Sequence, residues 1–157
     1  MKYDLRVFPR FLFTALLALS GVVVADGLAD KVTVTDPFVR AVPPVVKTTA
    51  AFMQLESSDQ TERFLVDART PVAGAVELHM HVKDGEVMRM RRIPHIHLPP
   101  QQQVSLQPGG LHIMLFELKR NLNPDDEVPI TLIFDDGSSK DIVATVRTVH
   151  RPMKKMH

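Results

Sequence analysis

The chain has 157 residues, of which 45% are hydrophobic, and its 19 basic and 18 acidic residues leave a formal net charge of +1. These values fit one ordinary globular domain and exclude a disordered or fibrous chain. The nearly balanced charge, without a basic run interleaved with aromatic residues, also argues against nucleic acid as a partner.

Residues 1–25 predict a secretory signal peptide. Three basic residues within the first ten positions precede an apolar run at 11–25, and polar sequence follows. A run of about fifteen residues is shorter than the roughly 20 that span a bilayer. We therefore predict cleavage near Ala25, with cleavage after Ala29 as an alternative, a periplasmic location, and no membrane insertion after cleavage. The chain contains no cysteine that could carry the lipid of a bacterial lipoprotein or form a disulfide.

Residues 26–149 predict a single all-β domain. Nine short stretches of alternating or β-branched residues are strand candidates: 31–40, 48–56, 62–69, 74–82, 86–93, 103–107, 111–118, 128–134 and 140–149. Turn-forming sequences rich in proline, glycine and aspartate separate many of them. The twelve prolines, and the lack of a sustained 3.6-residue period, argue against long helices. We expect a β-sandwich or barrel.

A tight hairpin is predicted at "KDGE", residues 83–86, because Asp-Gly suits the positive φ angles of a two-residue turn. The first strand of this hairpin carries His79 and His81, and the second carries Met88 and Met90. Residues two apart in a strand share a face, so each pair points to one side. The sequence leaves open which methionine stands opposite which histidine.

Imidazole and thioether groups recur farther along the chain, where His112 and Met114 share a strand face. If these two converge with His79 and Met90, the site offers two imidazole nitrogens and two thioether sulfurs. Soft thioethers select Cu(I), and imidazole is compatible with several metals. A thioether has no proton to lose and forms no disulfide, so it can hold copper outside the cytoplasm. The lack of cysteine argues against a blue-copper centre and against a cysteine-type zinc site.

The spacing of these four residues resembles a known signature. The pattern of His79, ten residues, Met90, twenty-one residues, His112, one residue and Met114 is similar to the copper-binding signature of the PCu(A)C family of exported copper chaperones. The resemblance continues through "VRAVPP", "AAFMQLE" and "LQPGGLHIML", and covers residues 32–146.

This resemblance implies a cupredoxin-like β-sandwich or Greek-key barrel that binds one Cu(I) near its surface through His79, Met90, His112 and Met114. Our own hypothesis of copper transfer by successive ligand replacement places Met114 at the rim of the site rather than in the core. The resemblance also implies delivery of copper to a respiratory oxidase. The implied partners are the copper-binding subunit of cytochrome c oxidase and a Sco-like protein, and we expect a monomer.

Further histidines and methionines lie outside the signature. His81 and Met88 neighbour signature positions, and His95 and His97 would share one face of an extended strand. Imidazole pairs suit Cu(II), so a secondary Cu(II) site is a hypothesis. The alternative is that these are solvated polar groups or gap-filling side chains.

The C-terminal tail, residues 150–157, also contains imidazole and thioether side chains: His150, Met153, Met156 and His157. Chain ends are usually frayed and solvated. The alternative is a flexible arm that captures copper or assists its handover. Unchanged copper stoichiometry and transfer rate after removal of the tail would refute a role of the tail in copper capture or handover.

The favoured function is a periplasmic Cu(I) metallochaperone, and two alternatives stay open. A copper buffer or resistance protein would use the same site only to sequester the metal. A small copper redox enzyme is the other alternative. Because no acid–base pair or nucleophile accompanies the site, we expect no catalytic residues and no enzymatic activity.

Overall fold

The computed structural model describes residues 27–149, which form a nearly all-β domain. One helical turn, α1 (Leu28–Lys31), precedes ten strands: β1 (Val32–Arg40), β2 (Thr48–Ser57), β3 (Arg63–Arg69), β4 (Ala75–Asp84), β5 (Val87–Arg92), β6 (Ile96–Leu98), β7 (Gln103–Leu106), β8 (His112–Phe116), β9 (Glu127–Phe134) and β10 (Ser139–Arg147). The all-β prediction is confirmed. Both ends of every predicted strand lie within two residues of the ends of an observed strand.

Two predictions fall outside the described residues: the signal peptide at 1–25 and the role of the tail at 150–157. Within 27–149, no helix is long and apolar enough to cross a membrane.

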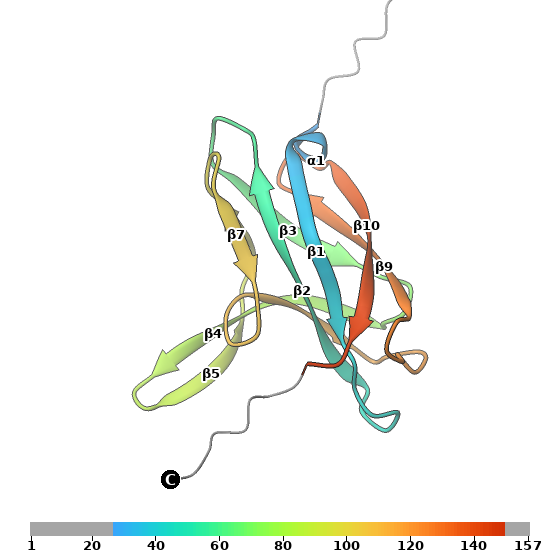
Figure 1. Ribbon diagram of the computed structural model, residues 1–157. Helices are drawn as coiled ribbons and strands as arrows, with labels where there is room; N and C mark the ends of the chain where they lie inside the picture. The colour runs from blue at the N-terminus through green and yellow to red at the C-terminus, as the bar shows by residue number, and fades with distance from the viewer. Residues whose placement is uncertain (1–26, 150–157) are drawn as a thin grey trace, which may run out of the picture.

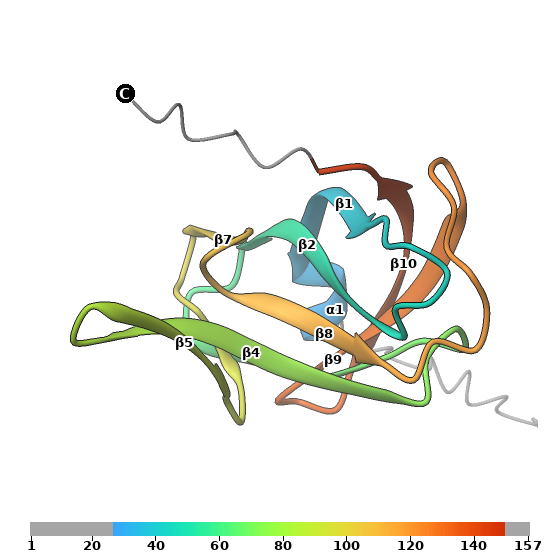
Figure 2. The ribbon, with the colours of Figure 1, turned by 90° about the horizontal axis from the view of Figure 1, so that it is seen from below.

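The strands form one mixed sheet rather than two separate ones. The order is β5-β4-β8-β2-β1-β10-β9-β3-β6, and β7 pairs with the half of β2 that β8 leaves free. Strands β1 and β10 run parallel, whereas the other paired strands are antiparallel. The sheet curls on itself, so β3 contacts β4 although the two are far apart in the strand order (Figures 1 and 2). Where we expected a β-sandwich or Greek-key barrel, a single curled sheet encloses the core.

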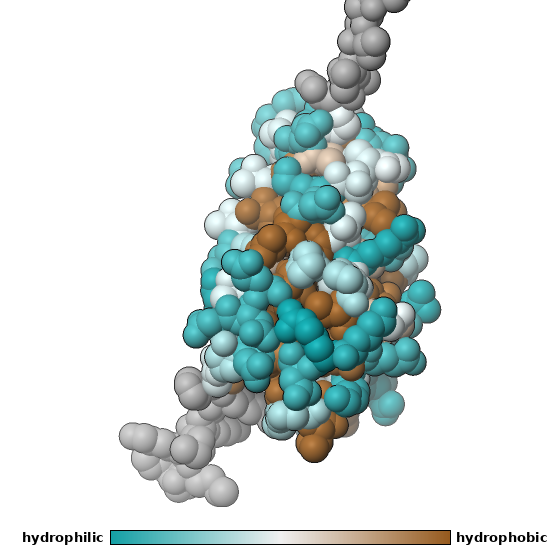
Figure 3. Space-filling model, turned by 90° about the vertical axis from the view of Figure 1, so that its right-hand side faces the viewer, coloured by the Kyte–Doolittle hydropathy of each residue, from teal (hydrophilic) through white to brown (hydrophobic). Residues whose placement is uncertain are grey.

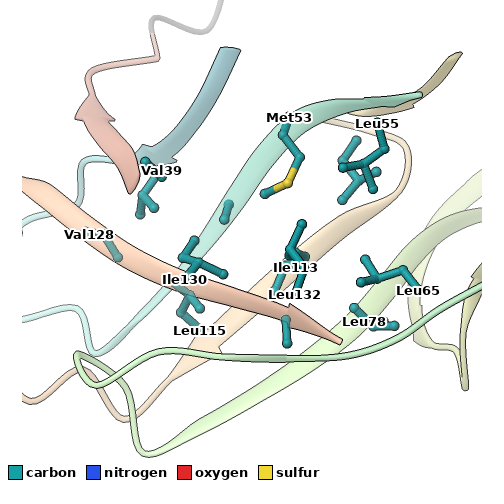
Figure 4. Packing of buried hydrophobic residues seen from close by; sticks show 14 of the residues in the cluster. Val39, Met53, Leu55, Leu65, Leu78, Ile113, Leu115, Val128, Ile130 and Leu132 are labelled. Carbon is teal, nitrogen blue, oxygen red and sulfur yellow. The ribbon is translucent and has the colours of Figure 1, made fainter. Parts of the chain in front are cut away.

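The main core lies inside this curl. Figure 4 shows apolar side chains from opposite parts of the sheet pointing toward one another, among them Val39, Met53, Leu55, Leu65, Leu78, Ile113, Leu115, Val128, Ile130 and Leu132. Because successive side chains of a strand alternate between faces, Ile113 and Leu115 of β8 enter this core, while Met114 does not. Met114 instead joins a second, smaller apolar cluster with Ala50 and Phe52.

The predicted hairpin is confirmed, and it projects from the body of the domain (Figures 1 and 2). Asp84 pairs with Val87, so the two turn residues are Gly85 and Glu86 rather than Asp84 and Gly85. Gly85 has a φ of 62°, a conformation that glycine adopts without steric cost. Strand β5 is the edge of the sheet, and all of its residues are exposed.

Exposed apolar side chains are unevenly distributed over the described residues. Three of the eight large ones, Val87, Met88 and Met90, lie on β5. On the face shown in Figure 3, apolar atoms lie between polar side chains. The edge strand of the hairpin therefore exposes two thioether groups, those of Met88 and Met90.

The segment α1 is held against the turn between β9 and β10 by two hydrogen bonds. The backbone N–H of Leu28 donates to Asp136 Oδ2 at 2.7 Å, and that of Ala29 donates to Ser138 Oγ at 2.9 Å. Leu28 and Ala29 are both buried in the main core. Cleavage after Ala29 would remove these two residues, whereas cleavage near Ala25 would retain them.

Candidate metal centre

The four signature residues lie on one face of strands β5, β4 and β8, the face turned away from the main core. Directly opposed pairs in the strand register are His79 with His112, Glu77 with Met114, and His81 with Met90. This register answers the question that the sequence left open, because Met90 stands opposite His81, and Met88 stands opposite Lys83. Met90 therefore lies nearer to His112 on β8 than Met88 does.

His112 is the most buried member of the group, at 2% exposure. Its Nδ1 lies 3.0 Å from the carbonyl oxygen of Gly110, which can only accept, so Nδ1 carries the proton and Nε2 carries a lone pair. That Nε2 lies 3.3 Å from the sulfur of Met90. A lone-pair nitrogen and a thioether sulfur cannot donate to each other. An ion held tetrahedrally at about 2.0 Å from nitrogen and about 2.3 Å from sulfur would separate these donors by about 3.5 Å.

The protonation state of His112 suits metal binding. Burial lowers the pKa of His112; the hydrogen bond to the Gly110 carbonyl works in the opposite direction, and the neighbouring groups His81, His79 and Arg40 lower it further. The imidazole is therefore neutral near pH 7, which is the form that binds a metal ion.

A pocket of about 300 Å³ opens beside His112. Its walls include Met90, Met114 and His81, with the Phe52 ring and the small side chain of Ala50 beside them. The structure thus brings together three of the four signature residues and one of the predicted secondary residues, His81.

His79 lies next to this pocket without lining it. Its ring centroid is 5.8 Å from that of His112, compared with 5.1 Å for His81. The Nε2 of His79 is 2.8 Å from Glu77 Oε2. This hydrogen bond lowers the pKa of Glu77, partial burial opposes it, and Arg92 adds to the lowering, so the carboxylate is ionised at neutral pH.

Two imidazole nitrogens in this region have no hydrogen-bond partner. The Nδ1 atoms of His79 and His81 are buried, and neither has a partner among the described residues. Buried polar atoms are nearly always satisfied, so two unpartnered ring nitrogens beside a sulfur–nitrogen contact call for an explanation. A soft metal ion satisfies such atoms, and the donor set of imidazoles and thioethers fits Cu(I).

The expectation that Met114 lies at the rim is wrong. Met114 is 9% exposed and packs with Ala50 and Phe52, because β8 is an interior strand of the sheet. Met90 is the exposed thioether of the site, at 46%, because it lies on the edge strand. The two methionines therefore differ in access: Met114 is buried within the fold, and Met90 is partly open to solvent.

The other predicted secondary residues do not join this site. Met88 shares the face of Met90 but is 54% exposed and stands opposite Lys83. His95 and His97 lie at the opposite edge of the sheet, where both rings pack against Phe64, with centroid distances of 4.7 and 5.4 Å.

No described residues form a group of three or more histidine, aspartate and glutamate side chains able to hold a metal ion. The secondary Cu(II) site stays a hypothesis. His150, Met153, Met156 and His157 lie outside the described residues.

Two functional partners were missed from the sequence. Glu77 lies two residues before His79 on the same strand face, a spacing that could have indicated a hydrogen bond between them. Gly110 belongs to the "QPGG" turn, and its backbone carbonyl contact with His112 has no signal in the sequence.

Known proteins resemble this chain in sequence. A family model described as "Putative lipoprotein LpqE-like" matches residues 32–146. A relative from Leifsonia xyli subsp. xyli, "Putative lipoprotein Lxx21020", is 31% identical over 120 residues, which are 76% of this chain and 71% of the relative. "Uncharacterized protein RP573" from Rickettsia prowazekii is 31% identical over 60% of this chain, and the match spans 53% of that protein.

Two solved structures share the fold. The "Copper-bound PCuAC domain from PmoF2" matches with a TM-score of 0.64 at 23% identity, over 76% of this chain and 94% of the domain. The solution structure of CuI-DR1885 from Deinococcus radiodurans matches with a TM-score of 0.60 at 35% identity, over 74% of this chain and 76% of that protein. The resemblance to PCu(A)C domains is confirmed.

Proposed function

The chain belongs to the LpqE-like family, and from this membership together with the site we propose that it is a Cu(I) metallochaperone that works outside the cytoplasm. The family description as lipoproteins supports an exported protein, and the predicted signal peptide supports the periplasm. No step of the proposed function requires a catalytic residue.

One observation carries the proposal: the lone pair of His112 Nε2 faces the sulfur of Met90 at 3.3 Å, in a pocket that Met114 also lines. Neutral nitrogen and sulfur donors leave the single positive charge of Cu(I) nearly unchanged, and thioethers favour this ion over harder metals. The Deinococcus radiodurans protein, solved with Cu(I) at 35% identity to this chain, supports the same choice of ion.

We take His79, Met90, His112 and Met114 as the ligand set. His81 adds a fifth candidate donor at the same pocket. The cargo ion can then change ligands one at a time, without passing through a state in which it is free in water.

The difference in exposure between Met90 and Met114 gives the handover a direction. Met90 lies on the projecting edge strand and is 46% exposed, so it is the ligand that an acceptor reaches first. Met114 and His112 are buried and hold the ion until the acceptor's own ligands replace them. Following the family resemblance, we propose that the acceptor is the copper centre of a respiratory oxidase, reached through the copper-binding subunit of cytochrome c oxidase or through a Sco-like protein.

Replacing Met90 by leucine tests the proposed site, with Met88→Leu as a matched control. Both methionines lie on the same face of β5 and have similar exposure, but the Met90 sulfur lies against His112. We expect Met90→Leu to weaken Cu(I) binding at least tenfold in competition with a Cu(I) chelator, and Met88→Leu to leave it unchanged. Equal effects of the two substitutions would contradict the assigned site.

A transfer experiment separates delivery from storage. The Cu(I)-loaded protein is mixed with the apo copper-binding domain of the acceptor, and the transfer rate is compared with the rate of copper loss to a chelator. A chaperone transfers faster than it releases, because the acceptor displaces ligands directly. Transfer no faster than spontaneous release would favour the copper buffer instead.

A further inference from the structure

The hydrogen bond between His79 and Glu77 determines which nitrogen of His79 is available to a metal ion. Glu77 Oε2 lies 2.8 Å from His79 Nε2. An ionised carboxylate can only accept, so the Nε2 of His79 carries the proton and donates it to Glu77. The remaining nitrogen, Nδ1, then has a lone pair.

The Nδ1 of His79 is buried and has no partner among the described residues. His79 stands directly opposite His112 in the strand register, and the two ring centroids are 5.8 Å apart. The unpaired lone pair therefore belongs to the residue that lies beside the sulfur–nitrogen contact of the site.

Both oxygens of the Glu77 carboxylate have partners within the protein. Arg92, opposite His79 on β5, places its Nη1 3.4 Å from Glu77 Oε1, while Oε2 faces His79. Each oxygen of Glu77 thus has its own partner. A hard carboxylate is also a poor ligand for Cu(I) beside two thioethers.

We infer that Glu77 is a positioning residue, which fixes His79 as a ligand through Nδ1, while the Gly110 carbonyl fixes His112 as a ligand through Nε2. The inference rests on the proposed function in naming Cu(I) as the ion, whereas the tautomer of His79 is a property of the metal-free protein. A carboxylate or carbonyl that holds the second nitrogen of a ligating histidine is a recurrent feature of metal sites, and its loss costs about 10- to 100-fold in metal affinity.

His81 is an internal control. It lies two residues after His79 on the same strand face and also has a buried Nδ1 without a partner, but no described carboxylate contacts its ring. Without such a partner, nothing in the described residues selects one tautomer of His81. His79 and His112 should each show one tautomer, of opposite kind.

The test is long-range ¹H–¹⁵N correlation of the histidine rings in the metal-free protein, at about pH 8.5, two units above the ordinary imidazole pKa of about 6.5. We expect a protonated Nε2 in His79 and a protonated Nδ1 in His112. Glu77→Leu should convert His79 to a mixture of tautomers, and Glu77→Gln should restore part of the preference through its carbonyl oxygen. Glu86→Leu removes an exposed carboxylate from the same hairpin and should change neither ring.

Cu(I) is then added to each protein in competition with a chelator. We expect the Nδ1 resonance of His79 to shift on loading, and Glu77→Leu to weaken Cu(I) binding about 10- to 100-fold relative to Glu86→Leu. A protonated Nδ1 in His79 of the unaltered protein, or an unchanged tautomer in Glu77→Leu, would overturn the inference. Absence of Cu(I) binding in every protein would instead refute the proposed function, and the tautomers would still decide the role of Glu77.

Discussion

Met114 is both a proposed copper ligand and a buried side chain, so its two roles have to be separated by the choice of substitution. Met114→Ala removes the sulfur and also empties space in the small cluster formed with Ala50 and Phe52. Buried methionine-to-alanine changes cost about 2–5 kcal/mol. Because Met114 is 9% exposed and lines a pocket into which neighbours can relax, we expect the lower end, about 2 kcal/mol.

Met114→Leu keeps nearly the same volume and removes only the sulfur, so its stability cost should be below about 1.5 kcal/mol. Losing one of four donors should nevertheless weaken Cu(I) binding at least tenfold, which corresponds to about 1.4 kcal/mol. Urea unfolding of the metal-free proteins measures the first quantity, and chelator competition measures the second. Unchanged Cu(I) affinity in a stable Met114→Leu protein would refute the sulfur as a donor, and unchanged stability in Met114→Ala would refute its packing role.

The remaining predictions concern the body of the domain. A protein that lacks residues 1–29 should be less stable in urea than one that lacks residues 1–25 by about 2 kcal/mol or more, because it loses the buried Leu28; equal stability would show that α1 contributes nothing. The hydrogen bond from Arg63 is the main cause that lowers the pKa of Asp59 to about 2, from an ordinary value of about 3.9; partial burial opposes it, and the Gln60 N–H and the charges of Lys31 and Arg63 add to the lowering. A lowered carboxylate pKa stabilises the fold above the unfolded value and loses this effect as pH falls toward the folded value. The stability difference between the natural protein and Asp59→Asn should therefore be largest above about pH 4 and shrink toward pH 2, and a constant difference across this range would contradict the ion pair.

The strands were predictable because each has its own local pattern. Strand β9 alternates buried residues with exposed or half-buried ones, and β8 is an apolar run that follows His112 and has the length of one strand. Strand β6 was missed because Ile96–Leu98 is only three residues long and carries two buried apolar residues around one histidine. So short a segment becomes a strand through pairing with β3, which is a tertiary contact.

The chemistry of the site could be predicted from residue types and spacing, whereas its geometry depended on strand register. A shift of one residue in the pairing of β4 with β5 would turn Met90 to the opposite face of the sheet. A neighbouring arginine, Arg89 or Arg91, would then take its place in the site. The burial of Met114 follows from the interior place of β8 in the sheet, and the local sequence does not determine that place. The two-residue spacing of Glu77 and His79 was a usable signal, whereas the hydrogen bond from His112 to the Gly110 carbonyl has no counterpart in the periodicity of the sequence.

The central claim, a soft donor set centred on His112 and Met90, is tested most directly by X-ray absorption at the copper edge of the protein loaded with one equivalent of Cu(I). The account predicts sulfur scatterers at about 2.3 Å together with imidazole nitrogen at about 2.0 Å, distances estimated from those of comparable metal sites. It also predicts loss of part of the sulfur signal in Met90→Leu. A spectrum with nitrogen and oxygen scatterers alone would contradict the claim.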